Sequence, residues 1–160
     1  MKTKALFCVV TVTVILICFS SCITYKTIKA YDGHKKDKAS LSIVQGVDCP
    51  HPKIGEFTKI IRIDNTPFER KAPAYDGKYR FMTLPGAHSF DIIHYQTNRR
   101  VLWFLGWYIV TFDAEAGKAY IIHADTNPET SVVDVYVTDA DSGERITSIV
   151  DYKYKFKEKE

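Results

Sequence analysis

The distribution of β-forming residues after residue 38 limits most strongly what this chain can fold into. Short runs of Val, Ile, Thr, Tyr and Phe alternate with Gly, Pro, Asn and Asp, and no long stretch repeats at the helical period. Branched and aromatic side chains pack well on a pleated surface, so these runs predict strands. We predict strands at 41–45, 57–64, 78–83, 88–96, 107–114, 118–125, 132–138 and 145–151, with 152–156 continuing the last one.

The segments between the runs contain glycines where tight turns need positive φ. Gly117 follows the run that ends at 114, Gly143 lies in the segment 139–144, and Gly86 precedes the strand at 88–96. Eight short strands joined by such turns predict an all-β fold. We expect a single antiparallel β-sandwich of immunoglobulin or transthyretin type, with an open barrel as the alternative.

The N-terminus has the three parts of an export signal. Two lysines come first, an apolar run follows at 5–17, and two serines stand before Cys22. The apolar run is shorter than the about 20 residues that cross a bilayer as a helix. We predict that residues 1–21 are a signal peptide, removed by cleavage between Ser21 and Cys22.

The four residues Phe19-Ser20-Ser21-Cys22 resemble the bacterial lipobox, whose cysteine receives a lipid. The resemblance implies acyl chains on Cys22, and two or more chains hold a protein stably on a bilayer. Ile23, in place of Asp, implies transfer to the outer membrane, facing the periplasm. The expectation is therefore a protein of the bacterial cell envelope that is anchored through Cys22 without spanning the membrane. An ordinary cleaved signal with an incidental cysteine is the alternative.

The mature chain has the size and charge of one ordinary domain. Residues 22–38 are rich in lysine and are interpreted as the lipidated cysteine and a basic tether, and 39–160 as the sandwich domain. Loss of Lys2 and Lys4 leaves 20 of the 22 basic residues against 19 acidic ones. This near-neutral balance argues against a nucleic-acid partner.

Two further resemblances concern the folded part. The segments 63–67 (IDNTP) and 84–88 (LPGAH) are similar to the PEGA type of surface β-module. The segment 84–88 is also similar, together with 30–33, 113–120 and 138–144, to small uncharacterised bacterial lipoproteins. The resemblance implies an envelope location and a β-rich fold, and it implies no activity.

The cysteines predict neither a disulfide nor a metal site. Cys8 and Cys18 leave with the signal and Cys22 takes the lipid, which leaves Cys49 without an intrachain partner. Cys49 is then either buried and inert or available for an intermolecular bond. Cys49 and His51 would make half a metal site, but no second pair lies at a ligand-like spacing.

The other residues with ligand or catalytic chemistry have ordinary structural interpretations. His88 and His94 share a strand face but lie about 20 Å apart, too far for one ion. Asp139 and Asp141 lack the rest of a calcium loop and fit a hairpin turn.

No pattern indicates catalysis. Glycosidase chemistry needs two carboxylates that face each other across a cleft, and neighbouring turn residues such as Asp113 and Glu115 rarely do so. The chain also has no Gly-x-Ser-x-Gly elbow. We expect no catalytic residues and no cofactor.

The most apolar window of the mature chain is VLWFLGWYIV at 101–110. Ten residues are too few to span a bilayer as a helix, so we interpret the window as either a buried strand or an exposed patch. Indole rings beside basic residues suit a membrane interface, and aromatic faces also suit sugar binding. The residues of this candidate patch are Arg99, Arg100, Trp103, Trp107 and Tyr108.

The sequence favours two functions over an enzyme. The first is a non-enzymatic envelope lipoprotein that contacts another envelope component, either a protein or a glycan. The second is a carbohydrate-binding or small-ligand-binding module that uses the aromatic patch.

Overall fold

The structure is a computed structural model that describes residues 25–47, 55–68, 79–98, 101–127, 129–130, 132–147 and 150–153. The predicted cleavage site and lipid anchor, at Ser21 and Cys22, lie outside these residues, as do Cys49, Arg99 and Arg100. Within the described ranges, no helix has the length and apolar character needed to cross a membrane.

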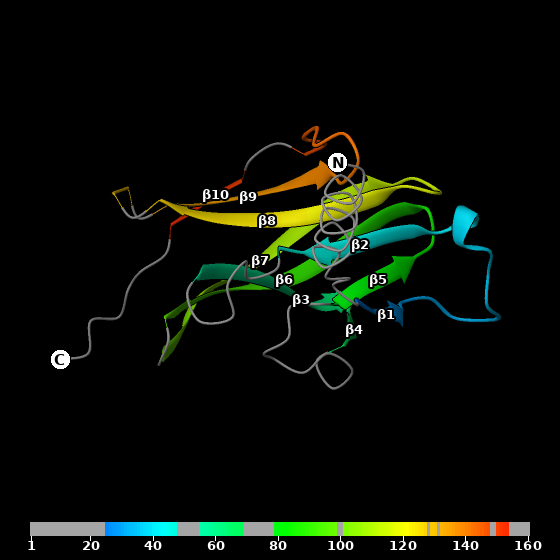
Figure 1. The fold of residues 1–160 in the computed structure, drawn as a ribbon, viewed down its shortest axis with the longest axis horizontal. Coiled ribbons are helices and arrows are strands. Elements are labelled where there is room, and N and C mark those ends of the chain that lie inside the picture. The colour runs from blue at the N-terminus through cyan, green and yellow to red at the C-terminus, as the bar shows by residue number, and fades with distance from the viewer. Residues whose placement is uncertain are drawn as a thin grey trace, which may run out of the picture.

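Two β-sheets make up the described fold (Figure 1). The six-stranded sheet has the order β1-β5-β2-β8-β9-β10, and the four-stranded sheet has the order β4-β3-β6-β7. A short 3-10 helix, η1 (Lys38–Ser40), precedes β2. The strands are β1 (Lys26–Lys29), β2 (Ser42–Gly46), β3 (Gly55–Ile63), β4 (Thr66–Pro67), β5 (Tyr79–Thr83), β6 (Gly86–Asn98), β7 (Val101–Ala114), β8 (Ala119–Asn127), β9 (Val132–Asp139) and β10 (Val150–Lys153).

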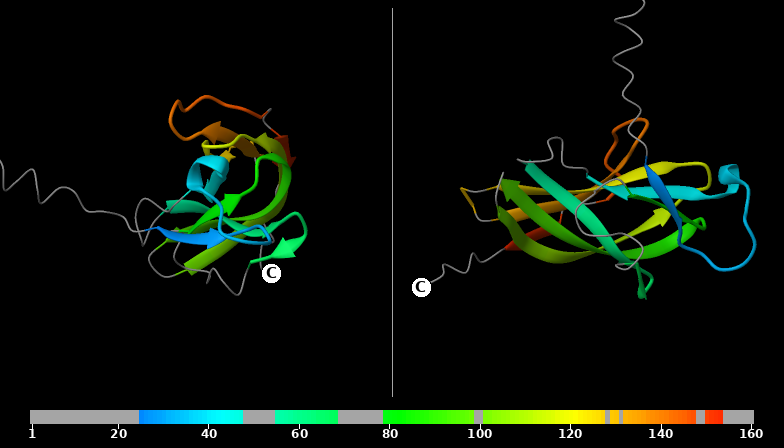
Figure 2. Two further views of the ribbon diagram at one scale, coloured as in Figure 1. Left: turned by 90° about the vertical axis from the view of Figure 1, so that its right-hand side faces the viewer. Right: turned by 60° about the horizontal axis from the view of Figure 1, so that its bottom comes forward.

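The two sheets pack face to face, which confirms the predicted β-sandwich. β3 lies against β2 and β8, and β7 lies against β9. Figure 2 shows the two layers curving around a shared interior. Stacked rings of Phe90 and Phe112, 5.0 Å apart, meet the edge of Tyr120 at 5.1 Å from Phe112, so aromatic contact joins the sheets. Burying a side chain of this size contributes about 1.5–3 kcal/mol.

The strand connections differ from the expected hairpins. Gly117 has the predicted positive φ of 78°, but β7 and β8 belong to different sheets, so the segment after β7 is a crossing between layers. Gly86, at φ 123°, likewise follows the passage from β5 to β6. The six-stranded sheet is also mixed, because β1 pairs parallel with β5 and β2 pairs parallel with β8.

Part of the predicted tether 22–38 is a strand. β1 runs parallel to β5, and its Ile28 is buried while the other three side chains are exposed. One buried residue in four gives no alternating pattern, which is why the sequence did not indicate this edge strand. The predicted strand 145–151 is also displaced: Arg145 forms an isolated bridge with Thr138, and β10 begins at Val150.

Gly46 at the end of β2 is a point where the two layers meet closely. A Cβ atom at this position would lie 1.9 Å from the backbone oxygen of Thr58 in β3. Backbone cannot move aside as a flexible side chain can. We expect Gly46→Ala to lower the free energy of unfolding by roughly 3 kcal/mol or more, the upper end of overpacking costs.

Urea unfolding of Gly46→Ala beside the wild type measures this loss. Val47→Ala is the matched control, since trimming this half-buried neighbour should cost only about 1 kcal/mol. Equal stability of Gly46→Ala and wild type would contradict the packing of β2 on β3.

Candidate functional site

Strand β7 divides the apolar window 101–110 between two environments. Leu105, Tyr108 and Val110 are buried, whereas Phe104, Trp107 and Ile109 are 59%, 51% and 55% exposed. The window is therefore both core and surface. Its outward side forms an apolar strip, the β7 outer strip, which consists of Phe104, Trp107 and Ile109.

A β-bulge places these side chains on one face. In the β6–β7 register, His94 pairs with Gly106 but Tyr95 pairs with Phe104, so Leu105 is the extra residue. Side chains alternate along a regular strand, and residues three apart would point to opposite faces. The extra residue resets this alternation, and Phe104 therefore points outward together with Trp107.

Phe104 ends a row of aromatic rings across the four-stranded sheet. Phe57 of β3 stacks on Tyr95 of β6 with ring centroids 5.2 Å apart, and Tyr95 meets Phe104 edge-on at 6.0 Å. Phe57 is buried at one end of the row, and Phe104 is exposed at the other. Contacts of this kind contribute about 0.5–1.5 kcal/mol beyond burial, so the row holds Phe104 in place.

Trp107 is held by a second cross-strand arrangement. The guanidinium of Arg62, on β3, lies over the indole at 5.5 Å from the ring centroid. Arg62 Nη1 donates a hydrogen bond to Asp91 Oδ2 of β6 at 3.1 Å, and the Asp91 side chain is only 8% exposed. A nearly buried carboxylate thus orients an arginine, and the arginine orients an exposed indole.

The predicted patch is only partly brought together. Trp107 lies on the outer face as expected, but Tyr108 is 4% exposed and points into the sandwich, so its assignment to a surface patch is wrong. The side chain of Trp103 lies outside the described part, as do Arg99 and Arg100. Sequence reasoning missed four outer-face residues that the sheet adds to Trp107: Phe104, Ile109, Arg62 and Asp91.

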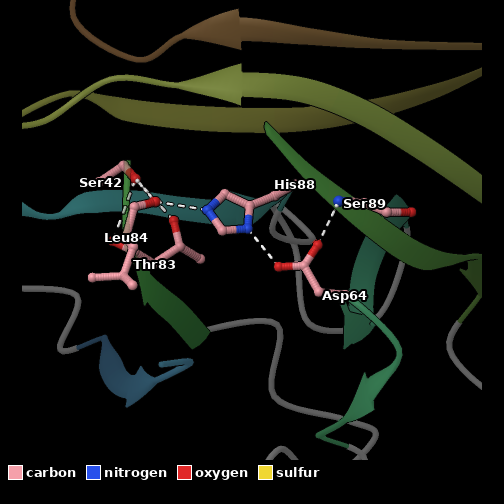
Figure 3. Close-up of polar contacts among 6 residues, drawn as sticks. All are labelled: Ser42, Asp64, Thr83, Leu84, His88 and Ser89. Atoms are coloured by element: carbon pink, nitrogen blue, oxygen red, sulfur yellow. Dashed lines mark hydrogen bonds and ion pairs between the residues drawn. The ribbon is translucent and has the colours of Figure 1, made fainter. Parts of the chain in front are cut away.

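A polar junction connects the start of β6 to the turn between β3 and β4 (Figure 3). Asp64 and Asn65 both have positive φ, 47° and 65°, as a two-residue type I′ turn requires. Asp64 Oδ1 accepts the backbone N–H of Ser89 at 2.9 Å, and Asp64 Oδ2 lies 2.5 Å from His88 Nδ1. The junction joins the segments 63–67 and 84–88 that carried the PEGA-like resemblance.

The same junction contains the side-chain types of a hydrolytic triad but not the arrangement. Catalysis of that kind needs the second imidazole nitrogen on the serine hydroxyl. Here His88 Nε2 contacts the backbone oxygen of Leu84 at 2.7 Å, while the buried Ser42 hydroxyl pairs with Thr83 Oγ1 at 2.8 Å. These contacts tie β2, β5 and β6 together at one end of the sandwich.

His94 is fully buried between the sheets. Its Nε2 contacts Thr126 Oγ1 of β8 at 2.9 Å and Glu56 Oε2 at 3.1 Å, and its Nδ1 faces the backbone oxygen of Phe57 at 3.3 Å. Burial lowers the pKa of His94, although the facing carboxylates of Glu56 and Asp125 act in the opposite direction. His94 is thus an interior polar link between the layers.

A groove of about 670 Å³ lies near the end of β7, beside the turn after β9. Asp113, Glu115 and Glu144 line it together with Lys118 and Asp139. Asp139 binds Lys118 Nζ at 3.1 Å, and its other oxygen accepts two backbone N–H groups of the turn, which lowers the pKa of Asp139 to about 2. This confirms that the carboxylate of Asp139 stabilises a turn.

Within the described ranges, no group of three or more His, Cys, Asp or Glu side chains is placed to hold a metal ion. Comparisons with protein-family models, curated proteins and solved structures give no match to this chain.

The buried histidines predict how stability depends on pH. Burial lowers the pKa of His123 as well as that of His94. A folded-state pKa below the unfolded value of about 6.5 means that the unfolded chain binds more protons below that pH. The free energy of unfolding should be highest above about pH 6.5 and fall as the pH is lowered from there.

Urea unfolding between about pH 5 and pH 8 tests this expectation. His94→Gln and His123→Gln should each reduce the slope, because neither variant side chain gains a proton in this range. A wild-type stability that stays level or rises as the pH falls below about 6.5 would contradict the role given to these histidines.

Proposed function

We propose that this chain is a bacterial envelope lipoprotein of interaction type. In this proposal it is exported, cleaved before Cys22 and held on the membrane by lipid on that cysteine. Its sandwich domain then contacts another envelope component. Ile23 after the anchor favours the outer membrane, with the domain in the periplasm.

The observation that carries the contact function is the β7 outer strip. Single exposed apolar residues are ordinary on protein surfaces, but contiguous ones mark interaction sites. Phe104 and Trp107 are exposed and yet oriented by Tyr95 and Arg62. Aromatic residues and arginine are also the types that contribute most to binding at interfaces.

The position of β1 limits how the anchored domain would sit. β1 begins at Lys26, so only residues 23–25 separate it from Cys22. The four steps from Cys22 to Lys26 reach at most about 14 Å. A lipid on Cys22 would keep the sandwich close to the bilayer, and its partner would be a component of the same membrane or one that lies directly beside it.

The anchor is tested by expressing the full chain in a bacterium and measuring intact mass and membrane partition. The wild type should lose residues 1–21, gain the mass of acyl chains and remain with the membrane. Cys22→Ala should lose both the added mass and the retention, because no sulfur is left to accept the lipid.

Cys18→Ala is the matched control, since this cysteine is removed with the signal and its loss should change neither result. If wild type and Cys22→Ala have no acyl mass and partition alike, the proposed anchor is wrong.

A further inference from the structure

The outer face of the four-stranded sheet combines a strip of exposed apolar side chains with a polar pair directly beside it. From Phe104 to Ile109, the strip extends for roughly 15 Å at the rise of a strand. The Arg62–Asp91 pair lies in the same row as Ile109, because the β3–β6 and β6–β7 registers align Arg62, Asp91 and Ile109. The face is thus an elongated apolar platform, with two aromatic rings and with a polar pair beside its Ile109 end.

This combination matches the surface of a sugar ring. A pyranose has a flat face of C–H groups and a rim of hydroxyl groups. Phe104 and Trp107 supply flat aromatic surfaces for the C–H face. A guanidinium carries five N–H donors, and the Arg62 side chain is 36% exposed, so it can donate to a hydroxyl in addition to Asp91. Stacking on a sugar requires aromatic rings in fixed positions. Tyr95 holds Phe104 and Arg62 holds Trp107.

Orientation of the rings before binding is the property that favours a sugar. An exposed indole that rotates freely loses side-chain entropy when a ligand stacks on it, and such ordering costs about 0.5–1.5 kcal/mol per side chain. Here Arg62 already restrains Trp107, and Asp91 restrains Arg62. Part of the side-chain entropy is therefore lost during folding and not on binding. This favours the binding of ligands, such as sugars, whose individual contacts are weak.

The charge of the face also admits an envelope glycan. Lys59 pairs with Ile93 and Ile93 with Trp107 in the two registers, so Lys59 lies on the same side as Arg62. The carboxylate on this part of the face, Asp91, is paired with Arg62 and nearly buried. Among the described residues that pair across the strip, a polysaccharide that carries some negative charge would meet no exposed carboxylate.

We propose that the β7 outer strip binds a polysaccharide strand, with Phe104 and Trp107 stacking on sugar rings and Arg62 donating to hydroxyl groups. This inference rests on the proposed envelope function and names the partner as the glycan of the cell wall. The length of the strip suits an oligosaccharide segment better than a single sugar.

The test is retention of the matured full-length protein, in mild detergent, by two insoluble polymers. Peptidoglycan sacculi contain an N-acetylhexosamine glycan with peptide stems, and chitin is an N-acetylglucosamine polymer without peptides. Both should retain the wild type. Trp107→Ala and Phe104→Ala should bind about tenfold more weakly or worse, as loss of a central contact typically does.

Two variants separate a binding role from a folding role. Ile146→Ala removes an apolar side chain that is 41% exposed and lines the groove with Lys118 and Asp139, and it should bind as the wild type does. Arg62→Lys keeps the charge but lacks the planar fork, and it should weaken retention while urea unfolding changes little. Retention of Trp107→Ala equal to the wild type would overturn the inference.

Two further outcomes would also overturn it. Retention by sacculi but not by chitin would assign the contact to peptide stems, and retention by neither would exclude this glycan. Both differ from failure of the anchor, because acyl mass and membrane partition are measured on the same protein. If the protein is lipidated and membrane-bound but is retained by neither polymer, the proposed location stands and only the proposed glycan partner is wrong.

Discussion

The pairing of β6 with β7, together with its one-residue bulge, is the constraint on which the rest of the structure depends. It runs from Gly86 paired with Ala114 to Asn98 paired with Val101. One side of this ribbon supplies Phe90, Ile92, Val110 and Phe112 to the core, so the ribbon must lie flat against the six-stranded sheet. The opposite side of the ribbon then forms the outer face of the four-stranded sheet.

The bulge decides which residues those are. Bulges commonly re-aim side chains near functional positions, and they interrupt a ladder that would otherwise be regular. Here the interruption is at Leu105, next to Gly106. Because of it, Phe104 joins the face of Trp107, and the aromatic row from β3 ends on an exposed ring. The polar pair of Arg62 and Asp91 reaches the same surface from two other strands.

Polar groups inside and at one end of the sandwich specify how the layers fit. His94 bridges the four-stranded sheet to Thr126 of β8, and His88 connects the Asp64 turn to the end of β5. Buried polar groups are costly when unpaired, so contacts like these disfavour other arrangements of the same strands. Burial of His94 also places a titratable group where a change of pH acts on folding.

The fold class could be predicted because period-two alternation is local. The strands at 118–125 and 132–138 match β8 and β9 closely. β1 and β4 were missed because four and two residues give no period to detect. The sequence correctly predicts a turn at Gly117. A glycine does not indicate, however, to which sheet the next strand belongs. Parallel pairing of β2 with β8 is likewise set by contacts distant in the sequence.

The candidate site was harder to predict than the fold. Trp107 was identified from the apolar window, yet Tyr108 was placed beside it because composition alone does not separate the two faces of a strand. Phe104 depends on the bulge, which exists only in the pairing with β6. Arg62 and Asp91 lie far away in sequence, and only the register brings them to the indole.

The most direct test of this account is measurement of cross-strand nuclear Overhauser effects between β6 and β7. The bulge predicts contacts of Tyr95 with Phe104 across the strands, together with contacts of Ile93 with Trp107. A regular ladder would instead pair Tyr95 with Leu105 and turn Phe104 away from the face of Trp107. Observation of the Tyr95–Leu105 pairing would contradict the existence of the β7 outer strip as a single surface.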